Sequence, residues 1–255
     1  MTSLIDKLKT YKQTVKLDER FSYNFDINST LFSDLEKNEL TSDNNVFRQN
    51  VKLKELIKTK ANGSYSLTDL NFWIINKWGG IQTFKRNDSN LEKINKFSEQ
   101  LSNSKLTKDT FSTISSLSKL SSFIDPDNYV IYDSRVIYAI NWLIMTSKLA
   151  DLKYFPMPTS RNKRLVDFDI NTIIHLTHLD SYQKKEPLFY DHSIAYFKFC
   201  DLIKSLSKTV FNDQTIKPYY LEMLLFTIAD NEIYNELTKC TTIEIKNLPL
   251  TAHLQ

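Results

Sequence analysis

Apolar residues recur every three to four positions along most of the chain, a spacing that places them on one face of a helix. The clearest such segment is SYSLTDLNFWIINKWGG, residues 64–80. Ser66, with an acidic residue three positions later, has the spacing of a helix N-cap. Gly79 stands where a glycine commonly follows a helix end. The expected buried face of this helix consists of Leu70, Trp73 and Ile74.

The helical pattern continues through the next 60 or so residues of the printed sequence. NDSNLEKINKFSEQL predicts a helix capped by Asp88 or Ser89. TKDTFSTISSLSKLSSFIDP predicts two short helices with a serine-rich break near Ser115 and a stop at Pro126. NYVIYD is then extended for a few residues. SRVIYAINWLIMTSKL predicts another helix, with Asp133 as its N-cap.

Three more helices are expected after a loop that contains two prolines. They run over about residues 169–181, 187–209 and 217–238, the last with Pro218 near its first position. The later segment TIEIKN fits either a short strand or a tail. These elements predict an all-α fold, formed as a single domain over residues 1–255. Its two main regions are expected at about 66–150 and 165–240.

Composition narrows the classes of function. The chain has only 3 glycines, where average usage would give roughly 18. It contains neither of the glycine-rich phosphate-binding motifs of nucleotide-binding proteins. Its two cysteines, Cys200 and Cys240, are too few for a disulfide framework or a four-thiolate iron–sulfur cluster. The 4 histidines do not have the spacing of a metal site. We therefore expect no metal and no cofactor.

The balance of charge is compatible with an anionic partner without requiring one. The net charge is +3, from 33 basic and 30 acidic residues. No apolar run reaches the length of a membrane span, and the N-terminus lacks the apolar region of a secretory signal. We expect a cytoplasmic protein with no membrane partner.

The order of elements between about residues 75 and 143 carries a resemblance to a known family. WGGIQTFKRNDSNLEKINKF is similar to a glycine turn followed by a helix, and DTFSTISSLSKLSSF occupies the place of a helical hairpin. YVIYDSRVIYAINWLI resembles a V-D-T-H-V helix start, with Asp133 at the aspartate and Ser134 at the threonine. Together these segments resemble the helix–hairpin–helix DNA glycosylases, the superfamily of endonuclease III. The resemblance implies a two-lobed helical fold with an active-site cleft between the lobes.

The resemblance also implies roles for particular residues. Asp133 would stabilise the positive charge that develops on the deoxyribose and would orient the attacking water. The hairpin has no glycine, so the hydroxyls of Ser115, Ser116 and Ser118 would hold a DNA phosphate. Ser115 stands where bifunctional members of the family carry a nucleophilic lysine, and Lys119 follows one turn later on the same face. A monofunctional enzyme is expected, with Lys119 as a weaker catalytic candidate.

Several candidate site residues also have an interpretation that requires no contact with DNA. Arg135 would contact phosphate, pair with Asp133 or face solvent. A loop after Pro158 contains further DNA-binding candidates, for which a solvated polar surface is the alternative: Arg161, Asn162, Lys163 and Arg164. Trp78 and Tyr132 are candidates for the base pocket, with core packing as the alternative. Asp133 itself has the alternative of a simple helix cap.

Within the superfamily, the glycine-free hairpin and I-Y-D-S-R-V are similar to the bacterial antiphage DNA glycosylases. That likeness implies excision of glucosylated hydroxymethylcytosine from viral DNA. We expect the protein to be a monomer. Two other hypotheses remain open. The chain is either a non-catalytic helical DNA-binding component of a defence or repair system, or a helical scaffold with no nucleic-acid role.

Overall fold

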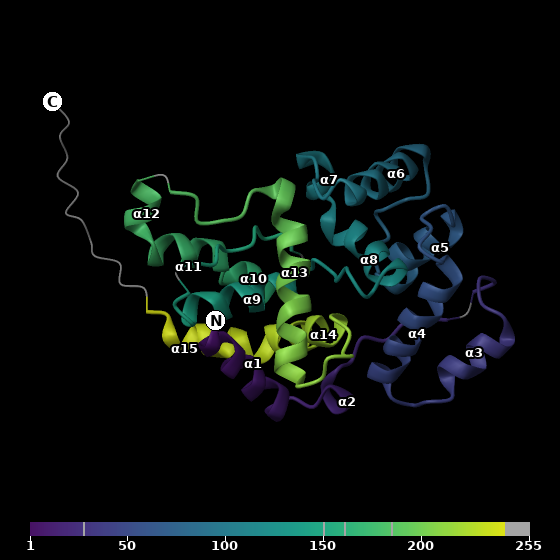
Figure 1. Ribbon diagram of the computed structural model, residues 1–255, viewed down its shortest axis with the longest axis horizontal. Helices are drawn as coiled ribbons and strands as arrows, with labels where there is room; N and C mark the ends of the chain where they lie inside the picture. The colour runs from purple at the N-terminus through teal and green to yellow at the C-terminus, as the bar shows by residue number, and fades with distance from the viewer. Residues whose placement is uncertain (28, 150, 161, 185, 243–255) are drawn as a thin grey trace.

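The computed structural model describes residues 1–27, 29–149, 151–160, 162–184 and 186–242. Within them all regular secondary structure is helical, and the β-type pairing is limited to an isolated bridge between Tyr154 and Phe189 (Figure 1). The predicted all-α fold is confirmed. None of the described helices is both long enough and apolar enough to cross a membrane. The TIEIKN segment lies almost entirely outside the described residues.

The first half of the chain forms nine α-helices and one π-helix among the described residues. They are α1 (Thr2–Thr14), α2 (Leu17–Arg20), α3 (Asp34–Thr41), α4 (Val46–Ala61), α5 (Thr68–Trp73), η1 (Ile74–Trp78), α6 (Asp88–Ser102), α7 (Lys108–Ser112), α8 (Ile114–Ile124) and α9 (Ser134–Thr146).

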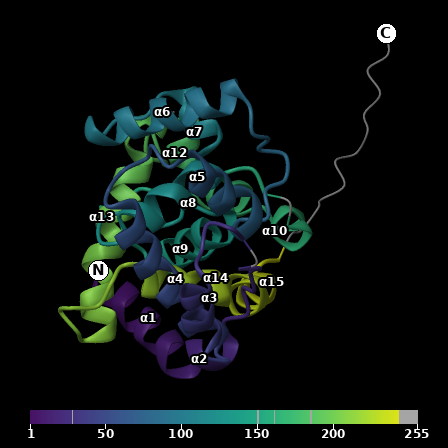
Figure 2. The same cartoon turned by 90° about the vertical axis from the view of Figure 1, so that its right-hand side faces the viewer.

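The second half adds short helices and then a long one that crosses the molecule. These elements are α10 (Lys163–Asp167), α11 (Ile170–Thr177), α12 (Leu179–Gln183), α13 (His192–Phe211), α14 (Tyr219–Ile228), η2 (Ala229–Ile233) and α15 (Tyr234–Cys240). Helix α13 packs against α1, although the two are far apart in the sequence, and both views draw α1 beside the lower half of α13 (Figures 1 and 2).

Helix α9 lies at the centre of the packing. Its residues Val136 to Ile140 are fully buried, and it contacts α14, η2, α11 and α1. A second contact, between α4 and α8, holds the hairpin against the N-terminal part of the chain. One hydrophobic cluster includes residues from Leu4 to Leu237. The start of α9 is therefore anchored in a rigid core.

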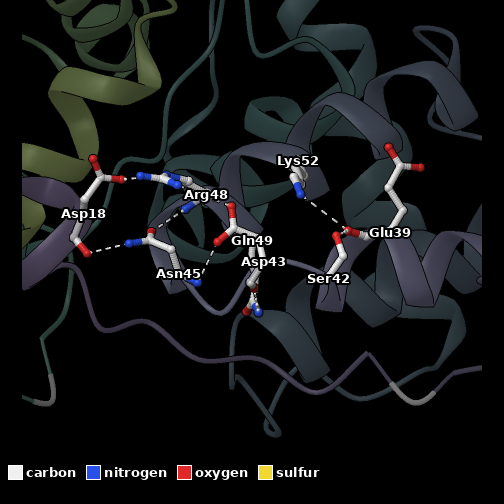
Figure 3. A network of polar contacts seen from close by, with 8 residues as sticks. All are labelled: Asp18, Glu39, Ser42, Asp43, Asn45, Arg48, Gln49 and Lys52. Atoms are coloured by element: carbon white, nitrogen blue, oxygen red, sulfur yellow. Dashed lines mark hydrogen bonds and ion pairs between the residues drawn. The ribbon is translucent and has the colours of Figure 1, made fainter.

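A polar network fixes α2 against α4 and α3 (Figure 3). The Asn45 side-chain amide donates to the Asp18 carbonyl at 2.6 Å, and Arg48 Nε donates to the Asp18 carboxylate at 3.2 Å. Gln49 donates to the Asp43 carbonyl at 2.6 Å. Because Asp18 lies in α2, these bonds also position the segment that follows it, residues 21–23.

The helical hairpin forms, but its turn is not where the sequence predicted. Helix α7 ends at Ser112 and α8 begins at Ile114, so Thr113 alone separates them. The predicted break near Ser115 is wrong. Ser115 and Ser116 belong to the first turn of α8, and the Ser116 amide donates to the Thr113 carbonyl at 2.9 Å. Local packing favours this one-residue turn, because Ile114 and Leu117 are then both buried.

Other predicted helix ends also shift. Helix α5 has no side-chain cap, and the Ser66 hydroxyl pairs with Ser64 instead of capping. Asn87 caps α6 in place of Asp88 or Ser89. Asp133 caps α9 as predicted.

After residue 165 the predicted segments are present with different limits. The first of them is divided into α11 and α12, α13 begins at His192, and the last continues through η2 into α15. Pro218 is the N-cap of α14, one position before the predicted one.

Candidate functional site

A cavity of about 470 Å³ lies between the N-terminal segment, the α7–α8 hairpin and the start of α9. Its lining comes from elements far apart in the sequence. The lining residues are Phe21, Tyr23, Lys54, Trp78, Gly79, Gly80, Ile81, Thr83, Ser112, Thr113, Ser115, Ser116, Lys119, Ile131, Asp133, Ser134, Arg135, Thr159, Asn162, Glu222, Met223 and Phe226.

Asp133 reaches the cavity from the N-terminus of α9. Its carboxylate Oδ1 accepts the backbone N–H of Arg135 at 2.9 Å, which caps the helix. The preceding extended segment is tied to the hairpin, because the Tyr132 amide donates to the Ser118 hydroxyl at 2.9 Å. Asp133 is only partly buried. The carboxylate is thus held in place by its cap bond and remains accessible from the cavity.

Two of the predicted site residues are structural instead. Ser118 is 0% exposed and holds the Tyr132 amide, so it is not available to a DNA phosphate. Tyr132 is also 0% exposed, and its hydroxyl donates to the Pro156 carbonyl at 2.8 Å. The predictions for these two residues are wrong, because both side chains point into the core that supports Asp133.

Lys119 extends from α8 into the cavity wall. It is 6% exposed, and its ammonium Nζ donates to the Ser115 carbonyl at 2.6 Å. Burial lowers the pKa of Lys119, while the charges of Asp133 and Glu222 act in the opposite direction. The Ser115 hydroxyl is buried in the cavity wall with no hydrogen-bond partner among the described residues. The hairpin therefore brings the Lys119 amine and the Ser115 hydroxyl, which has no hydrogen-bond partner among the described residues, into the same part of the cavity wall.

Two further ionisable residues in the cavity wall were not predicted. Lys54 of α4 is 0% exposed; its Nζ donates to the carbonyl and hydroxyl of Ser122 and lies 4.3 Å from the Phe123 ring centroid. Glu222 of α14 is 4% exposed, and its Oε2 accepts the Ile131 amide at 3.3 Å. The sequence carries a signal for both: each is a charged residue within the apolar stripe of its helix.

Burial shifts both of these groups toward their neutral forms. It lowers the pKa of Lys54 to about 8, with the Glu222 charge acting in the opposite direction. It raises the pKa of Glu222, with the Lys54 charge and the Ile131 N–H acting in the opposite direction. Neither Lys54 nor Lys119 makes a direct ion pair with a carboxylate among the described residues.

Aromatic rings form another wall of the cavity. Tyr23 and Trp78 lie with their ring centroids 4.9 Å apart, and Phe226 lies 5.8 Å from Tyr23. The Tyr23 hydroxyl donates to the Trp78 carbonyl at 2.7 Å. Burial, with a further contribution from the Asp133 charge, raises the pKa of Tyr23 to about 12. Trp78, a candidate for the base pocket, lines the cavity, whereas Tyr23 and Phe226 were missed because they lie far from the motif in sequence.

A cluster of polar contacts centred on Asp230 borders the cavity. Arg135 donates to the Asp230 carboxylate at 2.8 Å, and the Asn162 amide donates to its other oxygen at 2.6 Å. Arg164 Nη1 donates to the Asp230 carbonyl at 3.1 Å. Lys163 is exposed. Of these, only Arg135 and Asn162 line the cavity. The remaining loop candidate, Arg161, lies outside the described residues.

Both π-helices border this site. Helix η1 ends at Trp78 in the aromatic wall, and η2 supplies Asp230 to the polar cluster. Short π-helical segments inside α-helices occur frequently at functional sites, because the extra residue redirects side chains. Helix η1 supplies the lining residue Trp78, and η2 contacts the lining residues Arg135 and Asn162 through Asp230, which favours this cavity as the functional centre of the protein.

The site has no recognisable cation-binding cluster. Among the described residues no group of three or more histidine, cysteine, aspartate or glutamate side chains is arranged to hold a metal ion. The cavity lining includes three basic side chains and two acidic ones. Arg135 is neutralised by Asp230, so the inner wall combines two amines with two carboxylates. Such a wall is suited to acid–base chemistry on a ligand that stacks on aromatic rings.

Protein-family models, curated proteins and solved structures contain no match to this chain.

Proposed function

We propose that this protein is a monofunctional DNA glycosylase that draws a modified base into the cavity and hydrolyses its N-glycosidic bond. The observation that carries the proposal is the meeting of Asp133, Lys119, Ser115 and Trp78 in one cavity, although they come from three different helical elements. The sequence resemblance assigns Asp133 to the catalytic helix start and assigns Ser115 and Lys119 to the hairpin. The proposal includes a two-lobed arrangement with this cavity between the lobes.

The chemistry follows from the position of Asp133. Breaking the bond between a base and deoxyribose develops positive charge on the sugar, and a fixed carboxylate stabilises that charge. The same carboxylate takes a proton from the attacking water. The cap bond to the Arg135 amide holds Asp133 in place without neutralising it. The product is DNA with an abasic site.

The dimensions of the cavity support a flipped nucleotide as the ligand. Enzymes that act on a base in DNA move it out of the stack into a pocket that reads its edges and stacks on aromatic side chains. A cavity of about 470 Å³ is within the range of small-molecule sites, roughly 300–1,000 Å³. Its aromatic wall and its hydroxyl groups at Ser112, Thr113 and Thr159 fit a base enlarged by a polar substituent. Glucosylated hydroxymethylcytosine in phage DNA has that character, which supports a role in antiphage defence.

A non-catalytic DNA-binding component is the alternative. It would have no need of an accessible carboxylate in an open cavity, and Asp133 is partly exposed there. The deciding experiment is incubation of the protein with phage DNA that carries different modified cytosines, followed by detection of abasic sites. Release of a base supports the glycosylase, and binding without release from any of these DNAs contradicts it.

A further inference from the structure

Two carboxylates share the cavity but lie in opposite environments. Asp133 is partly exposed and caps a helix, whereas Glu222 is 4% exposed and comes from the apolar face of α14. In enzymes that cleave glycosidic bonds, a pair of carboxyl groups with different surroundings divides the work between an acid and a base. The proposed reaction has a role for Asp133 but none yet for Glu222.

We infer that Glu222 is the general acid of the reaction, donating its proton to the departing base while Asp133 acts on the sugar and the water. This inference rests on the proposed glycosylase function. It concerns a residue outside the hairpin and the helix start, the two segments on which the sequence resemblance depends.

The proposed hydrolysis conserves protons and electrons. As the C1′–N bond breaks, its electron pair passes to the ring nitrogen of the base, and the Glu222 proton is transferred to a ring nitrogen or carbonyl oxygen of that base. The water oxygen forms the new bond to C1′, and its proton passes to Asp133. The two carboxyl groups then return to their starting states by exchange with solvent. No oxidant, metal ion or second substrate is required.

The surroundings of Glu222 raise the pKa of its carboxyl group. Three charged groups face it from the elements packed around α14: Lys54 of α4, Lys119 of α8 and Asp133 at the start of α9. Burial and Asp133 raise the pKa of Glu222, while Lys54 and Lys119 lower it. Burial is the largest of these effects.

Geometry supports the same role. Glu222 Oε2 accepts the Ile131 amide at 3.3 Å, which orients the carboxyl group beside the segment that leads to Asp133. Glu222 and Met223 line the cavity together with Phe226 of the aromatic wall. A base stacked on that wall would therefore share the cavity with both carboxyl groups.

The test compares wild type with Glu222→Gln on DNA duplexes that carry 5-substituted cytosines whose departing bases differ in acidity. The Gln side chain keeps an oxygen for the Ile131 amide but has no proton to donate as an acid. Loss of a general acid costs on the order of 100-fold or more in rate. We expect that loss for the least acidic departing bases and a much smaller one for the most acidic. The ratio of rates within one variant does not depend on how much of that variant is folded.

Glu236→Gln is the matched control. Glu236 is a partly buried glutamate that accepts from Tyr11 and Trp142 and does not line the cavity. If Glu222→Gln and Glu236→Gln show the same rates and the same dependence on the departing base, Glu222 is not the acid. If wild type itself releases no base from any of the duplexes, the proposed function fails instead, so the two failures are distinguishable.

Discussion

Lys119 crosses Gly79 so closely that residue 79 has no room for a side chain. A Cβ built on Gly79 would lie 2.7 Å from Lys119 Cδ and 2.6 Å from the Ile75 carbonyl oxygen. The backbone of Gly79 is in an ordinary helical conformation, with φ of −77°, so this glycine is needed for space. The left-handed residue of the turn is Gly80, with φ of +65°. The glycine turn therefore shapes the lysine side of the cavity as well as ending a helix.

The first prediction concerns this contact. Gly79→Ala should destabilise the fold by about 1–3 kcal/mol, because the added methyl group forces the Lys119 stem or the η1 backbone to move. It should also lower excision activity. Gly63→Ala is the control, since Gly63 has φ of +75° but nothing within 4 Å of a Cβ. Urea denaturation and excision assays of both variants check the prediction. Activity lost equally in the two variants would contradict a specific role for the Gly79 contact.

The second prediction concerns the reaction product. Lys119 donates to the Ser115 carbonyl and lies one turn beyond the position of a Schiff-base lysine. The enzyme should leave an intact abasic site, and borohydride should trap no covalent protein–DNA adduct. Gel analysis of the reaction with and without borohydride gives the answer. An adduct that maps to Lys119 would overturn the monofunctional assignment.

The third prediction concerns the predicted basic loop, residues 161–164, of which the structure places Lys163 and Arg164 in α10. A side chain that contacts DNA phosphate contributes about one unit to the salt dependence of binding. Lys163 is exposed. We therefore expect Lys163→Ala to reduce the salt dependence of DNA binding. Arg164 already donates to the Asp230 carbonyl and lies over Tyr234, so Arg164→Ala should also cost stability. Arg161→Ala completes the series. Binding of an abasic-site duplex across a range of salt concentrations is the measurement, and unchanged slopes in all three variants would leave this loop a solvated surface.

The fourth prediction concerns stability at alkaline pH. Burial lowers the pKa of Lys54 from 10.5 in the unfolded chain to about 8 in the folded protein. Between these values the unfolded state binds more protons at Lys54, so the contribution of Lys54 to the free energy of unfolding should rise with pH across that window. The gain attributable to Lys54 is on the order of 1–3 kcal/mol. Urea denaturation of wild type and Lys54→Met at pH 7 and near pH 10 checks it. If the free energy of unfolding changes with pH by the same amount in both proteins, the pKa of Lys54 is not lowered by burial.

Local signals in the sequence were sufficient for the helical fold and for the cap at Asp133. The limits of several helices were not predictable in this way, because tertiary packing decides between neighbouring caps. Asn87 in place of Asp88 is one case, and the one-residue turn at Thr113 is another. In each case the choice depends on which side chains are buried, and the local pattern does not contain that information.

Most of the predicted residues that line the cavity belong to the segments of the motif. Asp133, Lys119, Ser115 and Trp78 line the cavity. Ser118 was misassigned, because the hairpin turns two residues earlier than expected and its third serine then faces the core. Lys54, Tyr23, Glu222 and Phe226 come from parts of the chain with no motif, and only the three-dimensional fold brings them to the cavity.

A single substitution separates the proposed chemical role of Asp133 from its role as a helix cap. Asp133→Asn removes the negative charge but keeps a side-chain oxygen for the Arg135 amide, so α9 remains capped and the fold is retained. The measurement is single-turnover release of the modified base, together with binding of an abasic-site duplex. We expect base release to be abolished while folding and DNA binding persist. A variant that retains most of the wild-type rate would contradict the proposed role of Asp133.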